Sequence, residues 1–204
     1  SNNNYGPISI SVTDADGTRQ IGTGIPITRT NTVGVFSTVP MTLHANGIDD
    51  VVVTISPNAN FTHISGLELT RTLPENLLVD MQFSGGATQS GFQPFTHPSA
   101  SHSVPQELWF FSDLGVDGSV GVRYSTTSGT ITPRNRANVN HELGDLLEDF
   151  MPSSDDMTLR LTGIAEGDYW MTTYHHDVDA NRGLISIDVL DATGFRPDVK
   201  TGLS

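Results

Sequence analysis

The stretch that decides the fold is Leu159–Asp191, which reads LRLTGIAEGDYWMTTYHHDVDANRGLISIDVLD. Apolar and polar residues alternate on both sides of Ile164–Gly167, which predicts two strands joined by a tight turn. A polar loop and a third alternating segment, Leu184–Leu190, complete the stretch. In the second strand, one face carries Tyr169, Met171, Thr173 and His175, and the other carries Trp170, Thr172, Tyr174 and His176.

Alternating segments of this kind recur along the chain and are separated by turn residues such as those at Asp117 and Gly118. The clearest are Ile8–Val12, Val51–Ile55, Ile64–Thr70, Leu77–Phe83, Leu108–Ser112, Val120–Ser125 and Met157–Thr162. One segment instead has apolar residues at helical spacing. We therefore predict an all-β protein, an antiparallel jelly-roll β-sandwich with one short helix at about residues 140–150.

The last strand of the opening stretch has a near copy at the start of the chain. Ile8–Gly17 reads ISISVTDADG and Ile185–Gly194 reads ISIDVLDATG, with seven of ten positions identical at an offset of 177. Two strands of one sandwich can share a bare alternation, but identity that extends into the turn favours true repetition. We expect residues 1–71 to be the back part of one module, 72–76 a linker and 77–204 the front part of the next. The alternative is one permuted sandwich over residues 1–204.

Half a sandwich exposes an apolar face and unpaired strand edges. It must therefore be completed within the chain or by a neighbouring copy, as in donor-strand complementation. The expected partners are other copies of the chain or neighbouring repeats.

The composition excludes several classes of protein. The net charge is −13 with a single lysine, Lys200, which argues against binding to nucleic acid or to an anionic membrane surface. No stretch approaches the ~18 apolar residues of a membrane helix, so membrane insertion is not expected. Cysteine is absent, which excludes disulfides and thiol chemistry. An acidic chain rich in Ser, Thr and Asn favours a secreted or cell-surface protein.

Four segments carry a family resemblance: VDMQFSGGATQSGFQPF, PRNRANVNHELGDLLEDF, LRLTGIAEGDYWMTTYHHD and, earlier in the chain, DDVVVTISPNANFTHISGLEL. Together they resemble a galactose-binding-like or malectin-like β-sandwich module of large secreted bacterial surface proteins. In that comparison Gly163, Gly167 and Tyr169 are similar to residues that maintain the fold. The resemblance implies an extracellular, non-enzymatic module and fixes no ligand.

The first candidate site lies where the strand Asp168–Tyr174 ends. His175 and His176, with Trp170 or Tyr174 as a stacking platform, would form a sugar site at the rim of the sandwich. The alternative is that one histidine is buried and hydrogen-bonded while the aromatic rings fill the core.

A calcium loop is the second candidate. Asp177, Asp179 and Asn181 place oxygen ligands at alternate positions, as in the first half of a calcium-binding loop. Arg182 stands where that loop needs Gly, and Asp188 stands where it needs Glu, so this is not an EF-hand. The alternative is a solvated turn.

Two arginines, Arg134 and Arg136, precede the predicted helix and would grip a carboxylate or a sugar acid. The alternative is an internal ion pair with the acidic residues of that helix. The sequence contains no nucleophile elbow, no zinc-protease motif and no phosphate loop, so we do not expect an enzyme.

These observations lead to two hypotheses. The first is a non-enzymatic extracellular structural or adhesive repeat that assembles into a filament or surface array by β-strand complementation. The alternative is a carbohydrate-binding module of a secreted polysaccharide-related protein, with glycans as partners and calcium as a cofactor.

Overall fold

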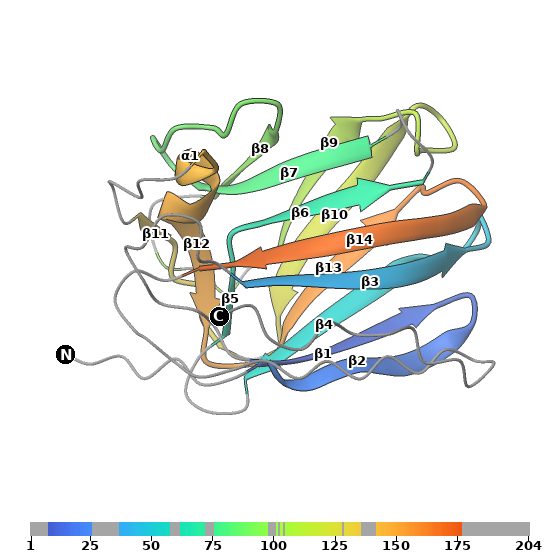
Figure 1. Cartoon of the computed structure of the whole chain (residues 1–204), viewed down its shortest axis with the longest axis horizontal. Helices are drawn as coiled ribbons and strands as arrows, with labels where there is room; N and C mark the ends of the chain where they lie inside the picture. Colours follow the sequence, from blue (N-terminus) through green and yellow to red (C-terminus); the bar gives the residue numbers. More distant parts are fainter. Residues whose placement is uncertain are drawn as a thin grey trace.

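A computed structural model describes residues 8–25, 37–57, 62–71, 76–97, 101, 103, 105–127, 129–135 and 142–176. These residues form an all-β sandwich of two main sheets (Figure 1). The six-stranded sheet has the order β2 (Gly17–Ile25), β1 (Ile8–Asp14), β4 (Val51–Pro57), β13 (Met157–Thr162), β10 (Ser119–Thr126), β9 (Gln106–Phe111). The five-stranded sheet has the order β3 (Ser37–Ala45), β14 (Gly167–His175), β6 (Gly66–Thr70), β7 (Asn76–Phe83), β8 (Gln93–His97).

A small third sheet closes one end of the sandwich. It joins β11 (Arg134–Asn135), β12 (Asp149–Ser153) and β5 (Thr62–Ile64), and the short helix α1 (Gly144–Glu148) leads directly into β12. Figure 1 shows α1, β11 and β12 together at the left end of the two sheets.

The core lies between the two sheets and follows from the alternation of side chains. In β1, Ile8, Ile10 and Val12 are fully buried, whereas Ser9 and Ser11 between them are partly exposed. The same pattern holds across the sandwich, where the other fully buried core residues include Val53, Ile55, Leu67, Leu69, Val79, Met81, Val122, Leu159, Leu161 and Met171. Each such side chain contributes about 1.5–3 kcal/mol by leaving water, which makes this core the main source of stability.

Strands from both sides of residues 72–76 pair with each other in both sheets. In the six-stranded sheet β4 pairs with β13, and in the five-stranded sheet β6 pairs with β7 and with β14. The strand β1, which is the first copy of the internal repeat, is held between β2 and β4 of its own chain. The second copy, Ile185–Gly194, lies outside the described residues, so the tandem array and its division at 72–76 stay predictions.

The helix is shorter than the predicted segment of about residues 140–150. It covers Gly144–Glu148, Leu143 provides no side-chain cap, and Asp149 is already extended. Asp149 and Phe150 instead pair with Asn135 and Arg134 as part of β12. The apolar spacing that predicted a helix through Phe150 therefore reflects burial in two consecutive elements.

The strand β8 departs from the predicted antiparallel pattern because it runs parallel to β7. Residues 84–92 must therefore cross back over the sheet before β8 begins. A hydrogen bond of 2.8 Å from the Gln89 backbone N–H to Asp80 Oδ2 joins this crossover to β7. Asp80, on the opposite side of β7 from the core residues Val79 and Met81, is consequently buried rather than solvated.

Candidate functional site

An exposed tryptophan lies on an interior strand of the five-stranded sheet. Trp170 belongs to β14, and its neighbours Tyr169 and Met171 point into the core, so Trp170 points outward. Its side chain is 62% exposed although β14 is paired on both sides, by β3 and β6. A rigid aromatic ring exposed on an interior strand offers a ligand a flat apolar surface on which to stack.

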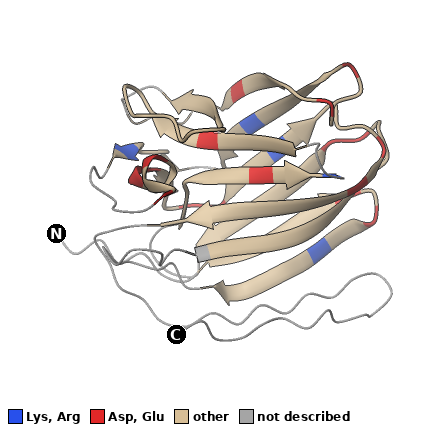
Figure 2. Cartoon of the chain, turned by 45° about the horizontal axis from the view of Figure 1, so that its top comes forward, with Lys and Arg blue, Asp and Glu red and all other residues tan. Residues whose placement is uncertain are grey.

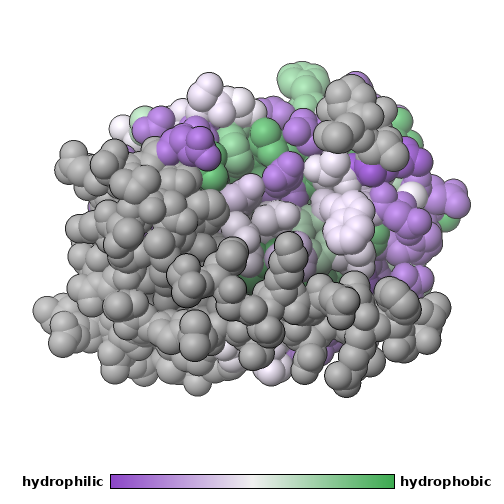
Figure 3. All heavy atoms as spheres, in the orientation of Figure 1, coloured by the Kyte–Doolittle hydropathy of each residue, from purple (hydrophilic) through white to green (hydrophobic). Residues whose placement is uncertain are grey.

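Polar residues surround this tryptophan. Trp170 is directly opposite Thr42 of β3 and Thr70 of β6. Thr172, two residues after Trp170 in β14, is opposite Glu68 of β6. Apart from the atoms drawn in grey, residues of hydrophilic or intermediate hydropathy occupy most of the face seen in Figure 3. We call Trp170 with Thr42, Thr70, Thr172 and Glu68 the Trp170 face.

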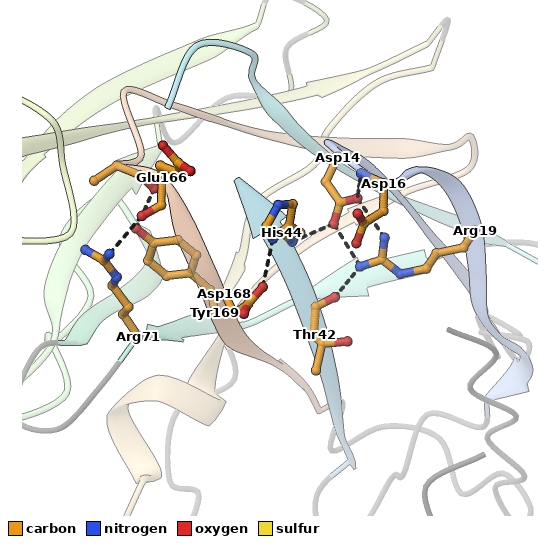
Figure 4. A network of polar contacts seen from close by, with 10 residues as sticks. Asp14, Asp16, Arg19, Thr42, His44, Arg71, Glu166, Asp168 and Tyr169 are labelled. Atoms are coloured by element: carbon orange, nitrogen blue, oxygen red, sulfur yellow. Dashed lines mark hydrogen bonds and ion pairs between the residues drawn. The ribbon is translucent and has the colours of Figure 1, made fainter. Parts of the chain in front are cut away.

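An ion pair borders the Trp170 face. His44 Nδ1 lies 2.7 Å from Asp168 Oδ1, and the two residues are opposite each other in β3 and β14 (Figure 4). The hydrogen bond to Asp168 raises the pKa of His44 above its usual value. The carboxylate of Asp168 is 92% exposed, which leaves it accessible to a hydroxyl group of a ligand.

A second ion pair holds the β1–β2 turn against β3. Arg19 donates two hydrogen bonds to the Asp14 carboxylate, at 2.7 and 2.8 Å, and a third of 2.5 Å to the carbonyl oxygen of Thr42 (Figure 4). Asp14 also accepts the backbone N–H of His44 at 2.9 Å. Burial acts to raise the pKa of Asp14, but the hydrogen bonds from Arg19 and His44 outweigh it and lower that pKa. This network fixes the edge strand beside Trp170.

Tyr174, the other predicted platform, is nearly covered. It is 9% exposed, its hydroxyl lies 3.2 Å from Glu68 Oε2, and its ring meets the edge of Phe92 at a centroid distance of 6.3 Å. Burial, followed by the charge of Glu68, raises the pKa of Tyr174 to about 12. Little of the ring is free to stack on a sugar, so Trp170 is the accessible platform of the two.

The two predicted histidines are buried. His175 Nδ1 lies 2.6 Å from the carbonyl oxygen of His63 and must donate to it, so Nε2 accepts from the Thr173 hydroxyl at 2.9 Å. Burial lowers the pKa of His175 to about 4. His176 is 1% exposed, with Nδ1 3.1 Å from the carbonyl oxygen of Leu147. In the described structure both side chains contact protein groups, whereas the alternative interpretation expected one buried histidine and placed the aromatic rings in the core, where Trp170 does not lie.

Of the remaining predicted site residues, the structure describes Arg134 alone. Arg134 is half-buried in β11 at the end of the sandwich that carries α1. Arg136 and the calcium candidates Asp177, Asp179 and Asn181 lie outside the described residues, so calcium binding there stays a prediction. Among the residues that are described, no group of three or more His, Cys, Asp or Glu side chains is placed to hold a metal ion. No described helix is long and apolar enough to cross a bilayer.

Sequence reasoning missed a pair of buried carboxylates near α1. Asp80 is fully buried. Its Oδ2 accepts the Gln89 N–H, whereas its Oδ1 has no hydrogen-bond partner in the described part of the chain. Burial raises the pKa of Asp80 to about 7, and the charges of Asp149 and Asp145 act in the same direction. Figure 2 shows acidic residues, in red, on the helix α1.

Asp149 is the second member of the pair. It is fully buried and accepts a hydrogen bond of 2.7 Å from Asn135 Nδ2. Burial raises the pKa of Asp149 to about 6, and the charges of Glu148 and Asp145 add to this effect. Both carboxylates contact the crossover between β7 and β8, because Gln89 donates to Asp80 and Gly86 lies against Asp149.

We expect Gly86→Ala to lower the free energy of unfolding by about 1–3 kcal/mol, a range typical of overpacking. A Cβ at Gly86 would overlap Asp149 Oδ2 and would come within 3.1 Å of the Phe83 carbonyl oxygen. Urea unfolding measures the loss. In the Asp149→Ala background the same substitution should cost distinctly less, and equal costs in the two backgrounds would contradict this contact.

Comparison of the chain with protein-family models, with curated proteins and with solved structures finds no match. The galactose-binding-like or malectin-like resemblance therefore stays a prediction.

Proposed function

We propose that this chain is a non-enzymatic adhesive module of a secreted or cell-surface protein, and that it binds neutral carbohydrate through the Trp170 face. The observation that carries the proposal is the 62% exposure of Trp170 on an interior strand, among hydroxyl and carboxylate groups. An aromatic ring offers the apolar face of a sugar a stacking surface, and the polar groups around it offer hydrogen bonds to sugar hydroxyls.

The charges favour a neutral ligand over an acidic one. The chain has a net charge of −13, Glu68 belongs to the Trp170 face, and Asp168 lies on a strand position next to it. An anionic sugar would approach these carboxylates at an unfavourable electrostatic cost. The basic groups Arg19 and His44 that border this face are themselves paired with Asp14 and Asp168, which supports the same choice.

Assembly by donation of β1 is less well supported than carbohydrate binding. The strand β1 has partners on both sides within its own chain, and Ile8, Ile10 and Val12 are fully buried there. Releasing it would expose these side chains and break two ladders. Association between copies is better supported at the edge strand β9.

Affinity electrophoresis in gels that contain neutral polysaccharides, namely galactan, mannan, xylan or β-glucan, tests the proposal. We expect at least one of them to retard the chain, and Trp170→Ala to weaken binding by about tenfold or more, because stacking contributes on the order of 1.4 kcal/mol. Trp170→Phe should keep most of the binding.

Ile48→Ala is the matched control, because Ile48 is an exposed apolar residue (88%) outside the Trp170 face. It should bind like the wild-type chain. Retardation by none of the neutral polysaccharides, or equal binding by Trp170→Ala and wild type, would contradict the proposal.

A further inference from the structure

One edge of the six-stranded sheet is open and apolar. The edge strand β9 pairs with β10 on one side, and no described strand pairs with its other side. Its side chains Trp109 and Phe111 are 59% and 88% exposed, and Leu108 is 38% exposed. Glu107 is the only charged residue of the strand.

The other three edge strands of the two main sheets carry features that discourage pairing. The edge of β3 includes Pro40, and Arg19 occupies the Thr42 carbonyl oxygen. The strand β8 includes Pro94, and β2 has an irregular register with β1. Proline, bulges and charges are the usual means by which sheet edges avoid association. The strand β9 has neither lysine nor proline, so it is the edge best suited to accept another strand.

The backbone of β9 presents a regular set of N–H and C=O groups on its open side. Ser112, just beyond the strand, donates its N–H to the Gly118 carbonyl oxygen at 3.1 Å. Hydrogen-bonded pairs recur at every second residue of an antiparallel ladder. The backbone N–H and C=O groups of the even-numbered residues of β9 therefore point towards β10. Those of Glu107, Trp109 and Phe111 point towards the open side. The bond of 3.2 Å from Gln93 Nε2 to the Phe111 carbonyl oxygen agrees with this orientation, and the exposed Gln93 side chain has to give up this bond before that oxygen can pair with a second strand.

Trp109 is held in place at this edge. A Cβ added at Gly121 would lie 3.2 Å from two atoms of the Trp109 ring, and one added at Gly163 would lie 3.5 Å from a third. The ring therefore packs against the glycine backbone of neighbouring chain segments and keeps its remaining surface exposed. A side chain fixed in this way loses little conformational entropy when a partner covers it.

We propose that two copies of this chain associate through β9, pairing the two strands antiparallel across a twofold axis with Trp109 opposite Trp109 of the second copy. This register matches every outward-facing backbone position of the strand, because Glu107 then lies opposite Phe111 of the second copy. It places both Trp109 rings side by side on one surface and covers Leu108. The pairing joins two six-stranded sheets into one continuous sheet.

A second copy is the favoured occupant because the strand is complementary to itself in this register. Twofold pairing requires the same surface to match itself, which the central Trp109 and the exchange of Glu107 with Phe111 satisfy. Two chains that each carry a net charge of −13 repel each other, so salt should strengthen the association.

Sedimentation velocity over a wide range of protein concentration, at low and high salt, tests the proposal. We expect the wild-type chain to shift towards twice the monomer mass as concentration and salt rise. Phe111→Glu should remain monomeric, since it places a carboxylate directly opposite Glu107 of the second copy, and like charges at directly opposed positions of a ladder are destabilising. Ile48→Glu is the matched control, because Ile48 has the same 88% exposure as Phe111 and the substitution adds the same charge, and it should dimerise like wild type.

Two further variants separate strand pairing from general stickiness. Glu107→Pro removes a backbone N–H that faces the open side, so it should weaken the dimer while circular dichroism and thermal unfolding stay near those of wild type. Trp109→Cys should form an intermolecular disulfide on oxidation, whereas Ile48→Cys should not, because paired Cα atoms in such a ladder lie about 5.5 Å apart. A monomeric wild-type chain under all conditions, or equal cross-linking of both variants, would overturn the proposal.

Discussion

Replacing Asp80 by Asn should stabilise the protein at about pH 8 and have far less effect at about pH 4. Burial raises the pKa of Asp80 in the folded state from 3.8 to about 7. Between pH 3.8 and about pH 7 the folded protein holds a proton that the unfolded chain releases, so stability falls as the pH rises. Above about pH 7 the full cost of the buried charge is present. At about 1.4 kcal/mol for each pKa unit, the cost is on the order of 4 kcal/mol.

The measurement is the free energy of unfolding in urea for wild type and Asp80→Asn at several pH values. An amide retains an oxygen for the Gln89 N–H, so the main change is the loss of the charge. Asp117→Asn, an exposed substitution in the β9–β10 turn, should change stability little at any pH. A variant that becomes less stable than wild type as the pH rises would show that the fold favours the ionised form of Asp80.

Replacing His175 by Gln should remove a large part of the acid sensitivity of the fold. Burial lowers the folded-state pKa of His175 from 6.5 to about 4. The stability that comes from keeping this ring neutral is fully present above about pH 6.5 and is lost as the pH falls towards 4. The loss is on the order of 3 kcal/mol. Protonation of Nε2 would also remove its role as acceptor for the Thr173 hydroxyl.

The test compares His175→Gln with wild type by urea unfolding between about pH 4 and pH 7. The difference between the two proteins is the informative quantity, because Asp80 and Asp149 act in the opposite direction over the same interval. His44→Gln should have the reverse effect, since the raised pKa of His44 adds stability at low pH that is lost as the pH rises. Parallel curves for His175→Gln and wild type would refute this assignment.

The strands of the core could be predicted from the sequence because alternation alone determines which side chains face inward. The segments Ile8–Val12, Val51–Ile55 and Met157–Thr162 were predicted as strands and are strands in the structure. The alternation in Asp168–Tyr174 also placed Trp170 on the face opposite Met171, and the exposure of these two residues agrees.

Features that depend on contacts between distant segments could not be predicted in this way. The crossover that buries Asp80 depends on β8 pairing parallel to β7, and nothing local in residues 84–92 specifies this. The strand β12 was hidden because Asp149 and Phe150 continue an apolar spacing that also fits a helix. Trp109 gave no signal, because an apolar residue in an edge strand reads like a core residue until the neighbouring strands are known.

The central claim is that Trp170 contacts the ligand, and the two tryptophans of the chain allow a direct measurement. In an NMR spectrum each indole N–H gives one signal, and Trp170→Phe identifies which signal belongs to Trp170. On titration with neutral hexose oligosaccharides, the account predicts that the Trp170 signal shifts in a saturable manner while that of Trp109 stays in place. A saturable shift of Trp109 alone, or no shift of either signal with any of the oligosaccharides, would contradict it.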